Sequence, residues 1–242
     1  MKKQILTVAL GLFTIATFAQ KNELKAAEKA IKKQDFATAV SSVDAAEGSI
    51  ASADAKLKSK FYFLKAQAYA GKKDYKVAAK AYNDLFEFEK ANRKRYTDKA
   101  TPLFNVMKDE VNQQAFKLHE AKNYAESAKA FYLRYTLDKR DTLFLSNAAQ
   151  LALQGKDYNT AFDYYNKLKD LGYTGVRDVF EATDKTTNKK TTFNTKREMN
   201  LMVKSGKYTN PVTKKSPSKR TDILKNLVNV LSKQKKYDEA VS

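Results

Sequence analysis

The sequence predicts an all-α protein built from stacked helical hairpins, and three observations lead to this fold class. Gly and Pro are scarce, with seven and three among 242 residues. A β-sandwich needs a turn signal every ~8–12 residues, so this scarcity favours long helices. Ala, Leu, Tyr and Phe are abundant, and small Ala beside large aromatics suits closely packed helices. A short phrase also recurs along the chain, which is typical of helical repeat proteins.

Residues 1–19 have the pattern of a secretory signal peptide. Two lysines near the start precede an uncharged apolar run over 5–19, and Thr17 and Ala19 place small residues where a signal peptidase reads them. The alternative is a membrane anchor, but the run is shorter than the ~20 residues of a spanning helix. We therefore predict cleavage after Ala19, a mature chain that begins at Gln20, and no transmembrane segment after cleavage.

The amino-acid composition limits the compartments and the classes of partner that are compatible with this chain. The chain contains no Cys, which excludes disulfides, thiolate zinc sites and the Cys of a lipoprotein anchor. With the signal peptide, this indicates export to the periplasm. The net charge of +19 falls to +17 when the two signal lysines are removed. Outside the inner membrane such a charge favours anionic lipid headgroups, glycans or acidic proteins as partners over nucleic acid. A merely solvated basic surface is the alternative.

The recurring phrase marks five units, each with a polar turn, an aromatic residue and a small residue three positions later. The aromatic residues are Phe36, Tyr75, Tyr124, Tyr158 and Tyr237. The small residues that follow them are Ala39, Ala78, Ser127, Ala161 and Ala240. Nine positions before the aromatics stand Ala27, Ala66, Ala115, Ala149 and Val228. Seven positions after the first four stand the bulky residues Val43, Tyr82, Phe131 and Tyr165.

This pattern resembles the tetratricopeptide repeat, whose unit is a helix, a tight turn and a second helix. The resemblance implies that each aromatic residue opens a second helix and that the small residues let the two helices approach. It also implies an α-solenoid, a right-handed superhelix with the first helices on its concave wall. The step from Tyr124 to Tyr158 equals the 34-residue period of the family. Ser127 and Val228 depart from the usual small Ala of the family.

The other steps predict where the array is extended. From Phe36 to Tyr75 the step is 39, which leaves a loop at 48–51. From Tyr75 to Tyr124 it is 49, so we expect longer helices on both sides of this gap. Thr101-Pro102 has the pattern of a cap and a first-turn proline, which predicts the start of a helix there.

The last step, 79 residues from Tyr158 to Tyr237, leaves room for an insertion. The predicted divisions are a signal peptide, four repeat units, a basic insertion and a partial fifth unit, over 1–19, 20–172, 173–218 and 219–242. Natural arrays end with a polar capping helix. Since the fifth unit stops at Ser242, early in its second helix, we expect the sequence to be a fragment of a longer chain.

The insertion differs in kind from the repeats. Its pattern is compatible with a β-hairpin in which 179–182 pairs with 191–193, followed by a short helix over 196–204. Asn210-Pro211 and Ser216-Pro217 are expected to interrupt the chain, and the next residue, Ser218, to cap the helix of the fifth unit.

The sequence indicates no catalytic residue, no cofactor and no metal site. It contains no glycine-rich phosphate loop, serine nucleophile elbow or zinc-binding helix motif. His119 is the only histidine, and with Glu120 alone beside it a metal site lacks ligands. Asp109 and Glu110 point about 100° apart on a helix and cannot act together. We expect a surface or groove role for His119 and a solvated face for the two acids.

Two surfaces remain as candidate sites. The resemblance implies that the groove-facing positions of the first helices are Phe63, Gln67, Asn112, Phe116, His119, Ser146, Gln150, Lys225 and Asn229. Exposed aromatics and amides suit an extended peptide or a partner helix, unless longer helices bury some of them. The insertion is the other surface, with eleven Lys or Arg and two acids over 184–220, a net charge of +9. Its candidate anion-binding residues are Lys189, Lys190, Lys214, Lys215, Lys219 and Arg220, unless they form a solvated loop.

The predicted function is that of a non-enzymatic scaffold or adaptor of the cell envelope, which binds another protein or peptide through the concave groove. The alternative is a binder of anionic envelope polymer or of the membrane surface through residues 184–220. A third possibility is an enzyme whose catalytic domain follows Ser242. The sequence does not identify the partner.

Overall fold

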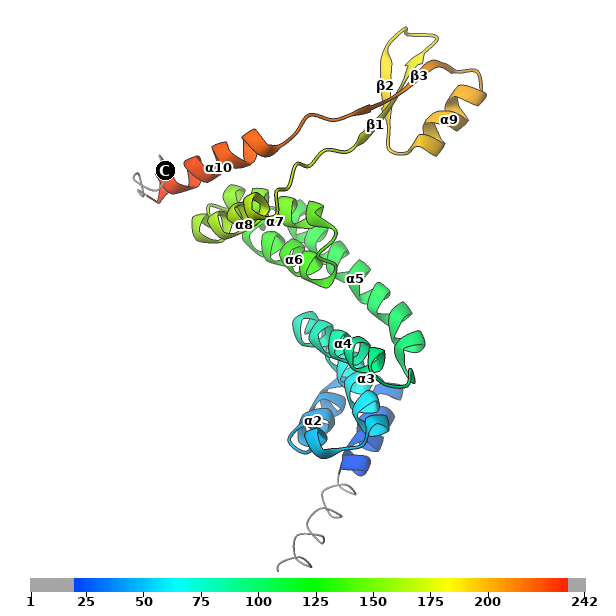
Figure 1. Ribbon diagram of the computed structural model, residues 1–242, viewed down its shortest axis with the longest axis vertical. Coiled ribbons are helices and arrows are strands. Elements are labelled where there is room, and N and C mark those ends of the chain that lie inside the picture. The colour runs from blue at the N-terminus through cyan, green and yellow to red at the C-terminus, as the bar shows by residue number, and fades with distance from the viewer. Residues whose placement is uncertain (1–19, 235–242) are drawn as a thin grey trace, which may run out of the picture. The chain divides into compact units, whose positions relative to one another are not determined.

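The structure, a computed structural model, describes residues 20–234 (Figure 1). The chain is mostly helical, with adjacent helices packed in pairs, and it contains a small three-stranded sheet. It divides into two compact units, Met1–Lys117 and Leu118–Ser242. The predicted signal peptide and the predicted second helix of the fifth repeat lie outside the described residues. None of the helices within 20–234 is both long and apolar enough to cross a membrane.

The first compact unit begins with a helix over 20–32. It continues with α2 (Phe36–Glu47), the short 3-10 helix η1 (Ile50–Ser52), α3 (Ala55–Gly71), α4 (Tyr75–Lys90) and most of α5 (Thr97–Glu120). The second contains α6 (Tyr124–Leu137), α7 (Thr142–Gln154), α8 (Tyr158–Asp170), β1 (Asp178–Asp184), β2 (Lys190–Phe193), α9 (Lys196–Lys204), β3 (Tyr208–Lys215) and α10 (Arg220–Lys233). The predicted loop at 48–51 contains the start of η1.

The four tight turns share one backbone geometry. The residue two positions before each aromatic has a positive φ, between 58° and 62°, and these residues are Gln34, Lys73, Lys122 and Lys156. In the second turn, Lys73 N donates to Ala70 O at 2.9 Å and Asp74 N donates to Tyr69 O at 3.0 Å. This pair of bonds satisfies the last carbonyls of the preceding helix. Each aromatic is then the first residue of α2, α4, α6 or α8, so the prediction that it opens the second helix is confirmed.

The small residues expected at helix contacts are buried in the first four predicted units. The small residues at both predicted positions are fully buried, namely Ala27, Ala39, Ala66, Ala78, Ala115, Ser127, Ala149 and Ala161. The fifth repeat differs, because Val228 is 45% exposed. The buried residues of α10 are Ile223, Leu227, Val230 and Leu231, and this helix packs on α8. The second helix that Val228 is expected to approach lies outside the described residues, so this contact stays a prediction.

The long gap between Tyr75 and Tyr124 is filled by longer helices, as predicted. Helices α4 and α5 have 16 and 24 residues, whereas α7 and α8 have 13 each. The predicted start of α5 is wrong, since the helix begins at Thr97 and Pro102 lies inside it. A buried side chain from the preceding helix, Glu89, takes the place of the expected cap, as described below.

The insertion forms a sheet of order β2-β1-β3, with both pairs antiparallel, and α9 packs against it (Figure 1). The predicted hairpin is confirmed, with Phe180 opposite Phe193 and Ala182 opposite Thr191. The predicted helix over 196–204 is α9. Ala182, Phe193 and Met199 form a small core, so the insertion has an apolar centre of its own.

The insertion departs from prediction after α9. The segment expected to break at Asn210-Pro211 is instead the edge strand β3. Two residues, 210 and 211, face the single residue Ala182 of β1, and Asn210 has a φ of 50°. A bulge on an edge strand tolerates proline because no ladder hydrogen bond is lost there. The predicted N-cap of α10, Ser218, is wrong, because Lys219 occupies the N-cap position. Ser218 Oγ still accepts a hydrogen bond from Arg220 N at 3.3 Å.

Candidate functional site

A cavity of about 290 Å³ in the first compact unit is the strongest candidate site. Three segments line it, namely the helix over 20–32, α3, and the start of α5. The sequence resemblance makes these the first helices of three repeats, although it placed the start of the third helix only at Thr101. The lining residues are Glu28, Ile31, Lys32, Lys60, Phe63, Leu64, Gln67, Tyr96 and Lys99. We call this cavity the first-helix groove. Its size suits one or two side chains of a peptide rather than a large cofactor.

The apolar part of the first-helix groove centres on two stacked rings. The ring centroids of Phe63 and Tyr96 are 4.8 Å apart, with an interplanar angle of 24°. Both side chains are half-buried, and Ile31 and Leu64 stand beside them in the lining. A stacked aromatic pair that keeps part of its surface exposed offers apolar contact area at a small entropic cost, because the rings are already ordered.

The polar part of the groove carries more positive than negative charge. Lys60 Nζ donates to Glu28 Oε2 at 2.5 Å, and Lys32 Nζ lies 3.4 Å from Glu28 Oε1. The hydrogen bond from Lys60 lowers the pKa of the Glu28 carboxyl, although burial opposes the shift. Lys99 is exposed and forms no ion pair with any described residue. Three lysines and one glutamate leave a net charge of +2, which favours an acidic group on a bound segment.

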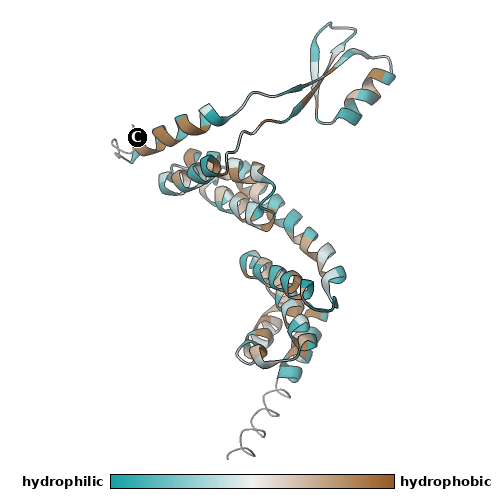
Figure 2. Cartoon of the chain, in the orientation of Figure 1, coloured by the Kyte–Doolittle hydropathy of each residue, from teal (hydrophilic) through white to brown (hydrophobic). Residues whose placement is uncertain are grey.

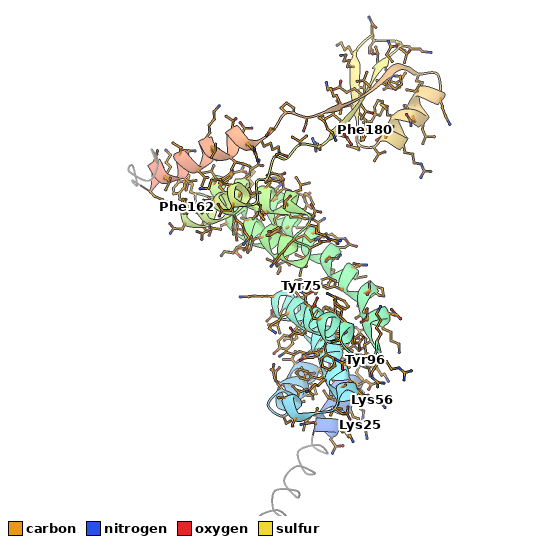
Figure 3. All side chains as sticks on the ribbon, in the orientation of Figure 1. Lys25, Lys56, Tyr75, Tyr96, Phe162 and Phe180 are labelled. Atoms are coloured by element: carbon orange, nitrogen blue, oxygen red, sulfur yellow. The ribbon has the colours of Figure 1, made fainter. Side chains whose placement is uncertain are left out.

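Glu89, near the end of α4, fixes the segment that carries Tyr96. Its side chain is 1% exposed, and its carboxylate accepts hydrogen bonds from the backbone N–H groups of Arg95, Tyr96 and Thr97 at 3.0, 3.1 and 2.9 Å. Thr97 Oγ1 also donates to it at 2.7 Å. These bonds satisfy donors at the N-terminus of α5, where a negative charge is favourable. The backbone of Tyr96, a residue labelled in Figure 3, is thus fixed by its hydrogen bond to Glu89.

The same hydrogen bonds keep Glu89 ionised. Burial by itself raises the pKa of this carboxyl, but the donors from Thr97, Arg95 and Tyr96 outweigh it and hold the pKa below its usual range. Glu89 is therefore a charged carboxylate surrounded by hydrogen-bond donors. Its role is to position Tyr96 and the start of α5.

Four of the predicted groove residues lie in the first compact unit. Phe63 and Gln67 line the first-helix groove, and Gln67 Nε2 donates to Phe63 O at 3.4 Å. Asn112 and Phe116 lie farther along α5 and are not part of its lining. Asn112 is half-buried, with an Oδ1 atom that has no hydrogen-bond partner among the described residues, and Phe116 is 48% exposed.

The other five predicted groove residues lie in the second compact unit. His119 is exposed at the end of α5, with its ring centroid 5.9 Å from that of Tyr124. Gln150, Lys225 and Asn229 are exposed on α7 and α10. Ser146 is only 4% exposed, so its assignment to a partner-binding surface is wrong. Helix α7 packs against both α6 and α8, and six of its thirteen residues, Ser146 among them, are buried.

The predicted anion-binding residues fall at two ends of the small sheet. Lys190 pairs with Thr183 at one end, beside Lys189, and both lysines are exposed. Lys214 and Lys215 lie at the other end, where they form ion pairs of 2.8 Å with Glu181 and Asp178. Lys219 and Arg220 follow the sheet at the start of α10, half-buried and exposed respectively. The six candidates therefore do not form one cluster.

A second cavity, of about 370 Å³, lies between α2, α3 and α4. Its lining carries matched charges, including the ion pairs Lys65–Glu47 at 2.5 Å and Lys80–Asp84 at 2.6 Å. Lys76 is an exposed lysine of this lining, and Tyr62 contributes an aromatic ring. This outer cavity has no excess charge, because three lysines face three acids, and it serves below as a control surface.

The sequence matches no family model and no curated protein. Within residues 20–234, no group of three or more Asp, Glu or His side chains is placed to hold a metal ion.

Sequence reasoning missed Tyr96, Lys99 and Glu89. Tyr96 and Lys99 were hidden by the wrong helix start, because they stood before the predicted cap at Thr101. The remaining lining residues carried a readable signal. On α3, residues 60, 63, 64 and 67 recur at spacings of three and four, as do 28, 31 and 32 on the preceding helix. Such a stripe marks one helix face.

Proposed function

We propose that this chain is a non-enzymatic adaptor of the cell envelope that binds a segment of another protein in the first-helix groove. The repeats would be tetratricopeptide repeats, and the groove would belong to the concave wall formed by their first helices. The signal-like residues 1–19 support an exported protein. The bound segment is a short extended peptide or one face of a helix.

The observation that carries this proposal is the Phe63–Tyr96 stack beside a surplus of lysines. Binding sites for peptides combine ordered aromatic contact area with a few polar groups that orient the chain. Here the two rings supply the contact area, and the Gln67 amide and Lys99 stand next to them in the lining. The geometry favours a peptide with an apolar side chain between the rings and Ile31, and with an acidic side chain that reaches Lys99.

The test is selection of binders from a displayed library of random peptides, followed by affinity measurements on variants. We expect the selected peptides to pair an apolar residue with a nearby acid. Phe63→Ala should weaken binding at least about fivefold, the ~1 kcal/mol threshold of interface residues that matter. Lys99→Glu should also weaken binding, since it inserts a like charge opposite the acid of the peptide.

The matched control is Lys76→Glu, which makes the same charge change on the outer cavity. Both lysines are exposed and neither has an ion-pair partner among the described residues, so neither change should alter folding. The proposal requires that Lys99→Glu weakens peptide binding and that Lys76→Glu does not. Equal losses from the two variants would mean that binding depends only on net charge, and the groove would not be the site.

A further inference from the structure

The distal end of the inserted sheet gathers two turns that are separate in sequence. Residues 185–189 join β1 to β2, and 205–207 join α9 to β3. Lys185 N donates to Lys207 O at 3.1 Å, which places the two turns side by side. Asp184 N donates to Lys189 O at 2.9 Å and closes the first turn. We call residues 184–190 and 204–207 the distal tip.

The distal tip is strongly basic. Its cations are all lysines, and all are exposed, namely Lys185, Lys189, Lys190, Lys204 and Lys207. None of the five forms an ion pair with another residue in the described part of the chain. The single acid, Asp184, accepts hydrogen bonds from Thr186 N and Thr187 N, both at 2.8 Å. Five lysines and one aspartate give a net charge of +4.

The opposite end of the sheet is different, because its lysines are neutralised. Lys214 and Lys215 pair with Glu181 and Asp178. Glu181 lies two residues from Thr183 along β1, about 7 Å at ~3.4 Å per residue, and Lys214 balances its charge. Glu181 and Asp178 are therefore paired with Lys214 and Lys215 rather than with the lysines of the tip.

We propose that the distal tip binds the surface of an anionic phospholipid membrane. The tip contains lysine and no arginine, and neither cavity described above includes any of its residues. A specific carboxylate or phosphate site favours the planar, two-pronged guanidinium group of arginine in a shaped pocket. Lysines are point charges on flexible stems, and several of them in exposed turns suit a diffuse layer of headgroups.

An exposed leucine next to the tip favours a lipid surface over a soluble polyanion. Leu201 of α9 is 57% exposed, and it lies three residues before Lys204 and four after Arg197 on the helix face that points away from the sheet core. The residues facing the core are Met199, Met202 and Val203. Figure 2 shows the β1–β2 turn in hydrophilic colours, whereas α9 has both hydrophilic and hydrophobic residues. An apolar side chain flanked by cations is typical of helices at the membrane interface.

The test is co-sedimentation of the full chain with vesicles of phosphatidylcholine, with and without phosphatidylglycerol, at low and high salt. We expect binding only to the anionic vesicles, and release by salt. Each lysine near such a surface contributes about 1 kcal/mol, or roughly fivefold in binding. The tip variant carries Lys185→Gln, Lys189→Gln, Lys190→Gln and Lys207→Gln. It should therefore lose roughly several hundredfold in binding.

The control variant removes four exposed lysines of the first compact unit and changes the net charge equally. Its changes are Lys25→Gln, Lys29→Gln, Lys56→Gln and Lys94→Gln. Circular dichroism checks that both variants keep their helices. We expect the control to retain vesicle binding. An equal loss in both variants would overturn the proposal, because binding would then follow net charge alone.

Two further measurements distinguish a membrane from an acidic protein as the partner of the tip. One uses the variant Leu201→Gln, and the other uses a soluble polyanion as competitor. We expect Leu201→Gln to weaken vesicle binding severalfold, and polyglutamate to compete poorly with the vesicles. Binding to polyglutamate that is tighter than binding to phosphatidylglycerol vesicles, and insensitive to Leu201→Gln, would overturn the membrane as the partner. This test does not depend on the first-helix groove. Neither the four-lysine tip variant nor Leu201→Gln should change peptide binding in that groove.

Discussion

Replacing Glu89 with alanine removes the acceptor that holds the start of α5. Three backbone N–H groups, those of Arg95, Tyr96 and Thr97, and the Thr97 hydroxyl would lose their common partner in a site where Glu89 is 1% exposed. A buried donor left without an acceptor costs ~1–3 kcal/mol. Since water can reach some of these groups once the side chain is gone, we use the lower bound for each N–H. The expected loss of unfolding free energy is about 3 kcal/mol.

The matched control is Glu87→Ala, two residues earlier on the same helix. Glu87 is 70% exposed, and Lys90 is its one ion-pair partner within residues 20–234, so its loss should change stability by less than ~0.5 kcal/mol. For a chain of this size, ~3 kcal/mol lowers the melting temperature by roughly 6–12 °C. Thermal and urea unfolding followed by circular dichroism measure both variants. Equal midpoints for the two would refute the reasoning about Glu89.

The Glu89 carboxylate also predicts a dependence on pH. Its pKa is lowered in the folded chain, so folding favours the ionised form. The corresponding stability is present at neutral pH and is lost as the pH falls through the usual carboxyl range toward the lowered pKa. Glu89→Ala should therefore flatten the acid limb of the stability profile, whereas Glu87→Ala should leave it unchanged.

Three further predictions follow from the packing. Gly71→Ala would place a Cβ in collision with the Phe36 ring, and we expect the melt to show a loss of ~1–3 kcal/mol. Ala149→Leu overfills a fully buried helix contact and should cost a similar amount; an unchanged midpoint would contradict the assigned register. Burial, together with the charge and the hydrogen bond of Glu110, raises the pKa of Tyr75 to about 12. The free energy of unfolding should therefore fall as the pH rises above 10. Urea unfolding should show a smaller fall for Tyr75→Phe.

The parts of the fold that were predicted correctly are set by residues close in sequence. The turn at Lys73 is one example. A left-handed residue, an aspartate cap and the aromatic Tyr75 follow each other directly, and the turn forms from their local hydrogen bonds. The hairpin of the insertion, with Phe180 opposite Phe193, likewise follows from alternation in two short segments. Local periodicity carries enough information for such elements.

The errors have tertiary causes. The start of α5 depends on Glu89, which is eight residues away from Thr97 and belongs to another helix. The strand β3 forms in spite of Pro211 because β1 supplies a partner and the bulge absorbs the missing donor. Ser146 was placed in the groove by its repeat position, but packing of α7 on both neighbours buries it. In the candidate site, Phe63 was predicted and Tyr96, which stacks on it, was not.

The most direct test of the central claim uses two neighbouring residues of α3. Phe63 lines the first-helix groove, whereas Tyr62 lines the outer cavity, and both are half-buried aromatics. A benzophenone amino acid is introduced at one position or the other, and each protein is irradiated with a peptide from the display selection. We predict a crosslinked product from position 63 and little or none from position 62. Equal crosslinking at both positions, or crosslinking only at 62, would contradict the proposal that the groove of the first helices binds the partner.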